Sequence, residues 1–518
     1  MATRSLPYLY NKKSKIDCLL SNRNCVLLTQ RSQRGFHAPS SSLKCLALSQ
    51  AVILEDSFLE RLRHWIHTLL HLWKLLALAT PVVLTAPLAL LSSSFAPSLE
   101  ETWWDLAVHF AQFSSPTLIK FMQWASSRRD MFPASFCDHF QKFHEKVPEH
   151  SWKFTEHTLN EAFGREWSEV LEIEKESIGS GCIAQVYRGK LKSDGRLVAV
   201  KVIHPNVKRM VEIDLGLMQS LVSFLDIFPL LRWVGARESV AEFSNAMLRQ
   251  LNLRTEAESL EHFRRNFAGR NGIRFPKPYM EYSSENVLLE SLEEGVHFHD
   301  FVATCIDVKK KKMFARVILD SYLKMVFLDN FAHGDLHPGN LLFDLADDSA
   351  NRTNKHTECV VAVDAGIVTR LEQKDLHNFV QVFHAVVTGN GHLAGELIVS
   401  QSKPTIITST NGERVEQRCK NIQAFCEGMN EIVSEALHWN LGIRKVHVGK
   451  LLKRVMELCC EQEVHLDGKY ASIVISIAVL ESIGRVLDPD IDVLSAALPI
   501  ILQSKLRLHS GRVVGNEG

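Results

Sequence analysis

The sequence is missing several patterns that would assign it to a common class of protein. Its eleven cysteines form no CxxC pair, which excludes a zinc ribbon or a framework of paired disulfides and favours reduced thiols. The 59 Lys and Arg residues balance the 59 Asp and Glu residues, which argues against a nucleic-acid binder that works through bulk positive charge. No GxxxxGK[ST] motif occurs, so the P-loop NTPases are excluded. What remains is ordinary globular composition over 518 residues, long enough for more than one domain.

Acidic residues are almost absent from the first fifty positions. Residues 1–50 carry eight basic side chains and a single acid, Asp17, among many serines. A basic, serine-rich and acid-poor segment is typical of a mitochondrial transit peptide. We therefore expect residues 1–50 to direct import into the mitochondrion. A basic tail without a targeting role is the alternative.

An uncharged stretch follows, from Leu75 to Leu99. It is long enough to cross a bilayer as a helix, and the basic segment before it contains two tryptophans, as interfacial anchors do. Three prolines within the stretch argue against one regular helix. We expect a membrane-associated or transmembrane segment over residues 60–99, with a buried apolar hairpin as the alternative.

A glycine-rich loop and a lysine-bearing strand come next in the chain. The pattern Gly179-x-Gly181 is followed by residues typical of a strand, then by a turn at Asp194-Gly195 and by an apolar strand that contains Lys201. A Rossmann glycine turn opens a helix, whereas this loop joins two antiparallel strands. That layout is typical of the N-lobe of a protein kinase, in which the lysine holds the nucleotide phosphates. The expected nucleotide contacts are Gly179, Ser180, Gly181, Cys182, Ile183, Ala184, Val186, Lys201 and Glu290.

The lysine needs a carboxylate partner, and one lies on a predicted helix over residues 238–267. Glu256 shares an apolar face with Leu260 and Phe263, where a charge is costly unless it is paired. We expect Glu256 to pair with Lys201; an exposed acid at the edge of the apolar face is the alternative.

Two short segments carry the expected chemistry. Asp335 and Asn340 are separated as in the D-x-x-x-x-N catalytic loop of kinases, and Asp364-Ala365-Gly366 is similar to the DFG metal site. In these roles Asp335 orients or deprotonates the attacking group, while Asn340 and Asp364 hold Mg²⁺ on the phosphates of ATP. Each residue alone is a common loop residue. The order of glycine loop, Lys201, Glu256 and these segments is far more specific.

The catalytic-loop sequence also occurs in small-molecule phosphotransferases, so the family must be identified from residues outside this loop. In this chain the loop reads His333-Gly334-Asp335-Leu336-His337-Pro338-Gly339-Asn340. Lys120-Phe121-Met122-Gln123 resembles a K-x-G-Q helix, and residues 481–489 resemble the matching C-terminal signature. The chain therefore resembles the aarF-domain-containing, UbiB-like atypical kinases, and most closely a mitochondrial member.

This resemblance implies an α+β, bilobal protein-kinase-like fold. The expected parts are a helical N-terminal extension (100–165), an N-lobe (166–295), a mostly helical C-lobe (296–505) and a tail (506–518). It implies Mg-ATP binding, ATPase or phosphotransferase activity, and a role in coenzyme Q biosynthesis or lipid metabolism at the mitochondrial inner membrane. Lipid and coenzyme Q biosynthesis proteins are the implied partners, and Lys120 and Gln123 the implied regulatory residues.

Three segments depart from the family pattern. Met122 replaces the glycine of K-x-G-Q, Gln250 and Asn252 replace both acids of an E-x-D motif, and Gly179 and Gly181 stand in a loop that is alanine-rich in the family. We expect a weaker inhibitory contact from Lys120 and more kinase-like nucleotide binding. A nucleotide-gated scaffold and a small-molecule phosphotransferase remain alternative functions.

Overall fold

The computed structural model describes residues 62, 65–66, 68–88, 97–127, 134–140, 149–164, 167–225, 236–345, 358–402, 404–408, 414–440, 448–466 and 468–509. The chain divides into two units, Met1–His71 and Leu72–Gly518, and the fold and the site below belong to the second. The expected transit peptide lies outside the described residues. So does most of the expected tail, although the last helix continues to His509, past the expected end of the C-lobe.

The expected membrane-associated segment contains a helix that begins before the uncharged stretch and ends before Leu99. One helix, Thr68–Leu88, has the length and the mean hydropathy (1.6) to cross a membrane, and none of its apolar window is buried. The expected segment over residues 60–99 stays a prediction, and its last residues belong to a separate helix, because α2 (Pro97–Gln112) begins at Pro97. Proline suits the first position of a helix, where its missing N–H is not needed. Signal sequences pass the same length and hydropathy test, so the membrane span stays a prediction.

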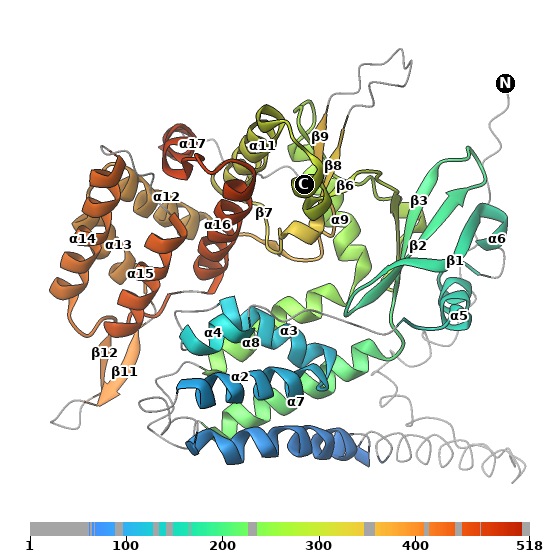
Figure 1. Cartoon of the computed structure of the whole chain (residues 1–518), viewed down its shortest axis with the longest axis horizontal. Helices are drawn as coiled ribbons and strands as arrows, with labels where there is room; N and C mark the ends of the chain where they lie inside the picture. Colours follow the sequence, from blue (N-terminus) through green and yellow to red (C-terminus); the bar gives the residue numbers. More distant parts are fainter. Residues whose placement is uncertain are drawn as a thin grey trace, which may run out of the picture. The chain divides into compact units, whose positions relative to one another are not determined.

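Short helices make up the N-terminal extension: α2, α3 (Pro116–Ser127), α4 (Ala134–Phe140), α5 (Trp152–Phe163) and α6 (Trp167–Val170). Helix α3 begins at Pro116, and it carries Lys120. It lies against α7 (Val207–Leu225) and α8 (Ala236–Gln250) (Figure 1), and its side chains Phe121 and Trp124 pack on Phe243. The lysine of the K-x-G-Q-like segment therefore lies on a helix anchored to the N-lobe.

The N-lobe is built on a four-stranded antiparallel sheet in the order β1-β2-β3-β5. Its strands are β1 (Leu171–Ser180), β2 (Ala184–Leu191), β3 (Leu197–Ile203) and β5 (Val287–Ser291). The predicted turn between β2 and β3 contains Gly195 at a φ of 74°, a conformation that favours glycine. Because side chains alternate along a strand, Tyr187 and Val200 pack with Leu159 of α5 on the outer face, and Ala199 and Lys201 face a cavity.

The helix predicted over residues 238–267 is two helices, α8 and α9 (Leu253–Asn266). Asn252 separates them with an extended backbone (φ −122°, ψ 98°), and its side chain accepts a hydrogen bond from the N–H of Arg254. Asparagine is a favoured N-cap residue, so a new helix starts at Asn252. The apolar periodicity of the sequence continues across this break and does not reveal it. The result places Glu256 in the first turn of α9, on the predicted buried face with Leu260 and Phe263.

The C-lobe combines a small sheet with a helical bundle. The sheet has the order β4-β9-β8-β6, and a two-stranded ladder joins β7 to β10. These strands are β4 (Ile273–Arg274), β6 (Val296–His297), β7 (Ala332–His333), β8 (Leu341–Asp344), β9 (Cys359–Ala362) and β10 (Val368–Thr369). The helices are α10 (Phe298–Thr304), α11 (Val308–Phe327), α12 (Gln373–Val387), α13 (Gly391–Gln401), α14 (Ile422–Asn440), α15 (Val448–Glu461), α16 (Gly468–Leu487) and α17 (Val493–His509). A hairpin of β11 (Thr405–Thr408) and β12 (Arg414–Gln417) lies between α13 and α14.

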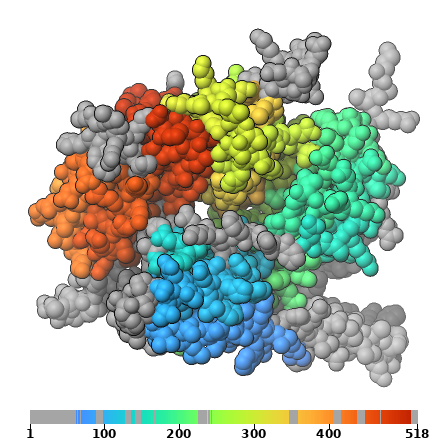
Figure 2. All heavy atoms as spheres, in the orientation of Figure 1, coloured from blue at the N-terminus to red at the C-terminus, as the bar shows by residue number. Residues whose placement is uncertain are grey.

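The apolar helix α16 belongs to the core. Ile473, Ile477 and Leu480 are buried in the main hydrophobic cluster, and α16 contacts α11; Figure 2 shows the red atoms of this region against the yellow-green atoms of α10 and α11. Within the same helix, Glu481 and Arg485 form an ion pair at 2.8 Å. The predicted class, an α+β kinase-like fold with two lobes and a mostly helical C-lobe, is confirmed.

Candidate active site

A cavity of about 820 Å³ lies between the glycine loop and the loops of the C-lobe. It is lined by every residue expected to contact the nucleotide: Gly179, Ser180, Gly181, Cys182, Ile183, Ala184, Val186, Lys201 and Glu290. It is also lined by the expected catalytic and metal-binding residues Glu256, Asp335, Asn340 and Asp364. Residues separated by more than 180 positions in sequence are thus brought to one place. Of the two expected regulatory residues, Lys120 lines the cavity and Gln123 does not.

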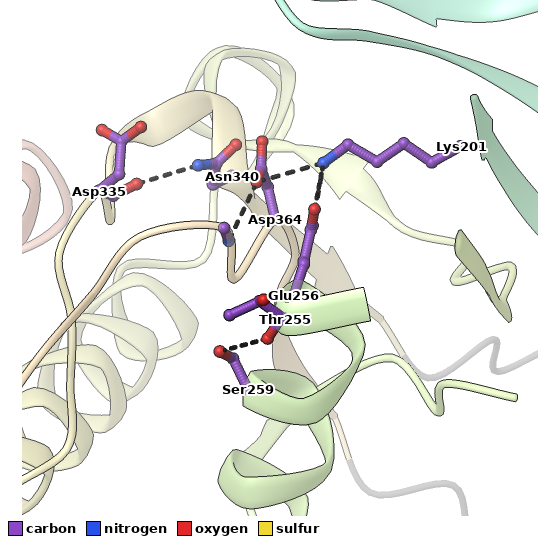
Figure 3. A network of polar contacts seen from close by, with 8 residues as sticks. Lys201, Thr255, Glu256, Ser259, Asp335, Asn340 and Asp364 are labelled. Atoms are coloured by element: carbon purple, nitrogen blue, oxygen red, sulfur yellow. Dashed lines mark hydrogen bonds and ion pairs between the residues drawn. The ribbon is translucent and has the colours of Figure 1, made fainter. Parts of the chain in front are cut away.

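Lys201 lies at the centre of an ionic network. Its Nζ atom is 2.9 Å from both carboxylate oxygens of Glu256 and 3.3 Å from Oδ1 of Asp364 (Figure 3). The Glu256 side chain is buried, with 5% of its surface exposed, whereas 49% of the Asp364 side chain is accessible. The predicted pairing of Lys201 with Glu256 is therefore present, and Asp364 keeps an open side toward the cavity.

Carboxylates outnumber the cations that reach them here. Burial raises the pKa of Glu256 to about 7 although Lys201 opposes the shift. Burial likewise raises the pKa of Glu290 to about 8, and the charge of Glu256 adds to this effect. Burial alone would also raise the pKa of Asp364, but the positive charges of Lys201 and Lys120 hold it well below its usual range. Asp364 is thus the ionised carboxylate of the group, and the two deeper ones favour protonation or a further cation.

Hydrogen bonds fix the loop that carries Asp335. The backbone N–H of Asp335 donates to Nδ1 of His333 at 3.2 Å, and the Asn340 side-chain amide donates to the carbonyl of Asp335 at 2.9 Å. His333 is fully buried, and burial lowers its pKa, so it stays neutral and accepts this bond. Gly334 is required here, because a Cβ at this position would lie 2.7 Å from Cγ2 of Ile367. The Asp335 carboxylate is left to face the cavity.

The segment Asp364-Ala365-Gly366 combines exposure and strain. Asp364 adopts a φ of 59°, which is uncommon for a residue other than glycine and occurs often at functional sites. Ala365, which stands where ordinary kinases have phenylalanine, is buried in the main core with 1% of its surface exposed. The backbone conformation turns the carboxylate toward Lys201 while the next side chain anchors the segment.

The glycine loop leaves open space toward the cavity. Its turn is held by a hydrogen bond that the N–H of Gly181 donates to the carbonyl oxygen of Ala184 at 3.0 Å. Neither Gly179 nor Gly181 needs a left-handed backbone, and an added Cβ would meet nothing closer than 3.8 Å. These glycines therefore leave space for a ligand and do not relieve strain.

Some of the residues that depart from the family pattern lie at the site or next to it. Lys120 lowers the pKa of Asp364, so the N-terminal extension brings a positive charge to the carboxylate that is expected to bind a metal. Gln250 lines the cavity. Asn252 caps the helix that carries Glu256. Its residue type is typical of an N-cap, but the sequence was interpreted only as a departure from the E-x-D motif. Ala199, two positions before Lys201, lines the cavity as well, and the period of two along a strand was the signal for it.

The donor set fits Mg²⁺ bound jointly by protein and phosphate. Among the described residues, no group of three His, Cys, Asp or Glu side chains forms a metal site by itself. Mg²⁺ is usually held by one or two carboxylates together with substrate phosphates, which Asp364 and the oxygen of Asn340 match. Oε2 of Glu290 is buried with no hydrogen-bond partner among the described atoms. The excess of carboxylates accounts for why a cation would bind favourably.

Comparison with known proteins gives a consistent result. The family model described as ABC1 atypical kinase-like domain matches residues 142–397. A probable serine/threonine-protein kinase, abkC of Dictyostelium discoideum, is 30% identical over 485 residues, covering 82% of this chain and 68% of that protein. A mitochondrial ABC1 family protein of Schizosaccharomyces pombe is 28% identical (86% and 72% covered), and a probable protein kinase UbiB of Providencia stuartii is 26% identical (74% and 67% covered). The solved Rv3197–erythromycin complex of Mycobacterium tuberculosis aligns with a TM-score of 0.42 at 16% identity, covering 74% of this chain and 97% of that one.

Proposed function

This chain belongs to the ABC1 atypical kinase-like family, and we propose that it binds Mg-ATP and transfers or hydrolyses the γ-phosphate. The observation that carries the proposal is the cavity of about 820 Å³ in which Lys201, Glu256, Asp335, Asn340 and Asp364 meet beneath a glycine loop. Members of the family are named probable kinases, and the family implies ATP binding.

The chemistry assigned to each side chain follows from its position. Lys201 is held by Glu256 at 2.9 Å and presents its ammonium to the phosphates. Asp335, fixed through its own backbone by His333 and Asn340, orients the attacking hydroxyl or water and accepts its proton. Asp364 and Asn340 would hold Mg²⁺, which neutralises the charge of the phosphates when it is bound. Phosphoryl transfer needs little more than such positioning and charge.

The proposed location is the mitochondrial inner membrane. Relatives in two yeasts are named mitochondrial ABC1 proteins, and the first fifty residues have the composition of a transit peptide. The helix Thr68–Leu88 supplies the proposed membrane anchor. Within this setting we place the chain with the mitochondrial members of the family and propose a role in coenzyme Q biosynthesis or lipid metabolism, with proteins of that pathway as partners.

Lys120 favours a second candidate, a nucleotide-gated scaffold. A lysine of the extension that faces the metal-binding Asp364 competes with a cation and slows turnover. In that case nucleotide binding would change the contacts of the extension, and phosphate transfer would be incidental. The two candidates differ in one measurable property, the fate of the γ-phosphate.

The deciding experiment follows labelled γ-phosphate from Mg-ATP in mitochondrial membranes that contain the full chain. Label is sorted into protein, lipid, soluble metabolite and free phosphate. Asp335→Asn removes the proposed base, and Asp105→Asn, on the exposed surface of α2, is the matched control. Label that is transferred by the wild type and the control, but not by Asp335→Asn, supports a kinase and identifies its acceptor class. If all released label is free phosphate, the result supports an ATPase. ATP binding without turnover would contradict the enzymatic proposal and favour the scaffold.

A further inference from the structure

A chain of buried polar groups runs beneath the glycine loop, outside the network described above. The hydroxyl of Tyr187 lies 2.7 Å from Oγ1 of Thr155, which lies 2.8 Å from Nε2 of His150. Nδ1 of His150 lies 2.7 Å from Nδ1 of His204, and Nε2 of His204 lies 2.9 Å from the carbonyl oxygen of Gly181. The chain thus joins the start of α5, the outer face of the sheet and the loop.

The hydrogens of this chain have one consistent order when both imidazoles are neutral. A carbonyl oxygen only accepts, so Nε2 of His204 carries a hydrogen and its Nδ1 is an acceptor. His150 must then donate from Nδ1, and its Nε2 accepts from Thr155. Thr155 in turn accepts from Tyr187. The reverse order would leave the hydroxyl hydrogen of Tyr187, a fully buried residue, without its acceptor.

The surroundings keep the two imidazoles neutral. Burial, then the charge of His204, lowers the pKa of His150 to about 4, and the nearby Glu149 only partly opposes this. Burial also lowers the pKa of His204, although its bond to Gly181 opposes the shift. A second hydrogen on His204 would place two N–H groups face to face across the 2.7 Å contact. A second hydrogen on His150 would lie on Nε2 and face the hydroxyl hydrogen that Thr155 donates there. The chain is therefore a neutral, directional structure around pH 7.

His204 holds the loop at two points. Its backbone N–H donates to the carbonyl of Ile183 at 2.8 Å, and its side chain donates to the carbonyl of Gly181. Both carbonyl oxygens are thereby bound by His204. An unbound carbonyl oxygen in the cavity would repel the phosphate oxygens of a nucleotide, because both carry negative charge.

We propose that His204 is a positioning residue for the triphosphate, and that His150 of the N-terminal extension sets the tautomer in which it acts. The inference rests on the proposed nucleotide-binding function and deepens it. It also gives the extension a role on the N-lobe that is separate from the electrostatic effect of Lys120 on Asp364. A protein that begins after residue 166 would lack both His150 and Thr155.

Two substitutions at one position separate loop positioning from packing. In His204→Gln the amide nitrogen replaces Nε2 and keeps the donor to Gly181. In His204→Asn the shorter amide keeps an acceptor for His150 but does not reach Gly181. We expect His204→Asn in the full chain to weaken binding of a non-hydrolysable Mg-ATP analogue about fivefold, the value of about one hydrogen bond. His204→Gln should stay within about twofold of the wild type.

Hydrogen–deuterium exchange without nucleotide makes the test independent of the proposed function. Residues 179–184 should exchange faster in His204→Asn than in His204→Gln, at equal Tm. Equal exchange in the two variants would overturn the inference. If the wild type binds no nucleotide, the proposed function fails, while the exchange difference still decides whether His204 positions the loop.

The tautomers provide a check that needs no variant and therefore holds even if His204→Asn does not fold. Imidazole ¹⁵N shifts of the wild-type chain at pH 7 should show hydrogen on Nδ1 of His150 and on Nε2 of His204. The opposite tautomers, or a charged ring at either position, would overturn the inference.

Discussion

The two walls of the cavity hold their shape by different means. The wall formed by the glycine loop is held by neutral hydrogen bonds that end on the carbonyls of Gly181 and Ile183. The opposite wall is held by charge, with Lys201 between Glu256 and Asp364 and with Glu290 nearby. A neutral wall keeps its geometry as pH and metal concentration change, whereas the charged wall depends on both. Five substitutions test this contrast, from the largest expected effect to the smallest.

Asp364→Asn should have the largest effect. It removes the ionised carboxylate of the charged wall, and asparagine tolerates the left-handed backbone at this position. Lys201 keeps Glu256 as a partner, so the fold should persist. We expect turnover of Mg-ATP to fall about 100-fold or more. The measurement is release or transfer of labelled phosphate, with Asp105→Asn as the control, and near-normal turnover would remove Asp364 from the site.

Glu290→Gln should change stability in a pH-dependent way. The pKa of Glu290 is raised to about 8 in the folded protein, so the folded state binds its proton more tightly than the unfolded state. The stability contributed by this group is present at low pH and is lost as pH rises from about 4.5 to about 8. The variant lacks this loss, and we expect it to be more stable than the wild type at pH 8.5 by on the order of 2 kcal/mol, with little difference at pH 5.

Thermal unfolding of the nucleotide-free chain at both pH values checks this expectation. Glu174→Gln, at an exposed position on β1, is the control and should show no such divergence. If the difference in stability between the wild type and Glu290→Gln is the same at both pH values, the pKa of Glu290 is not raised in the folded protein.

Lys120→Gln should change how nucleotide binding depends on the Mg²⁺ concentration. Lys120 contributes to the low pKa of Asp364, so its charge and Mg²⁺ compete for the same carboxylate. Without it we expect Mg²⁺ to support nucleotide binding at concentrations about threefold to tenfold lower. A Mg²⁺ titration of analogue binding measures the change, with Lys153→Gln on α5 as the control. An unchanged titration would contradict a role for Lys120 at the metal.

Gly179→Ala and Gly181→Ala should have the smallest effect. The added Cβ meets no close neighbour at either position, so Tm should not change. The methyl group would project where a phosphate approaches, and we expect affinity for Mg-ATP to fall about twofold to fivefold. Unchanged affinity for both variants would show that the nucleotide does not approach this wall.

The predictable parts of the site are those whose residues lie close together in the sequence or follow the period of one strand or helix. Lys201 in an apolar strand, Glu256 on an apolar helix face, and Asp335 with Asn340 each follow from a local pattern. The break at Asn252 was missed because apolar periodicity continues across it, and only the capping chemistry of asparagine marks the start of α9. The pair of His150 and His204 has no such signal, because the partners are 54 positions apart and pack only in the folded protein.

Ala365 has a consequence for the design of inhibitors. In ordinary protein kinases the phenylalanine of DFG packs in alternative positions that distinguish active from inactive states. Here a buried methyl group occupies that place, and no ring is available to move out and leave a hydrophobic pocket for a drug. Compounds selective for this protein would therefore need to recognise features that ordinary kinases lack. The buried carboxyl of Glu290, with an oxygen that lacks a partner among the described atoms, offers such a feature to a ligand with a well-placed hydrogen-bond donor.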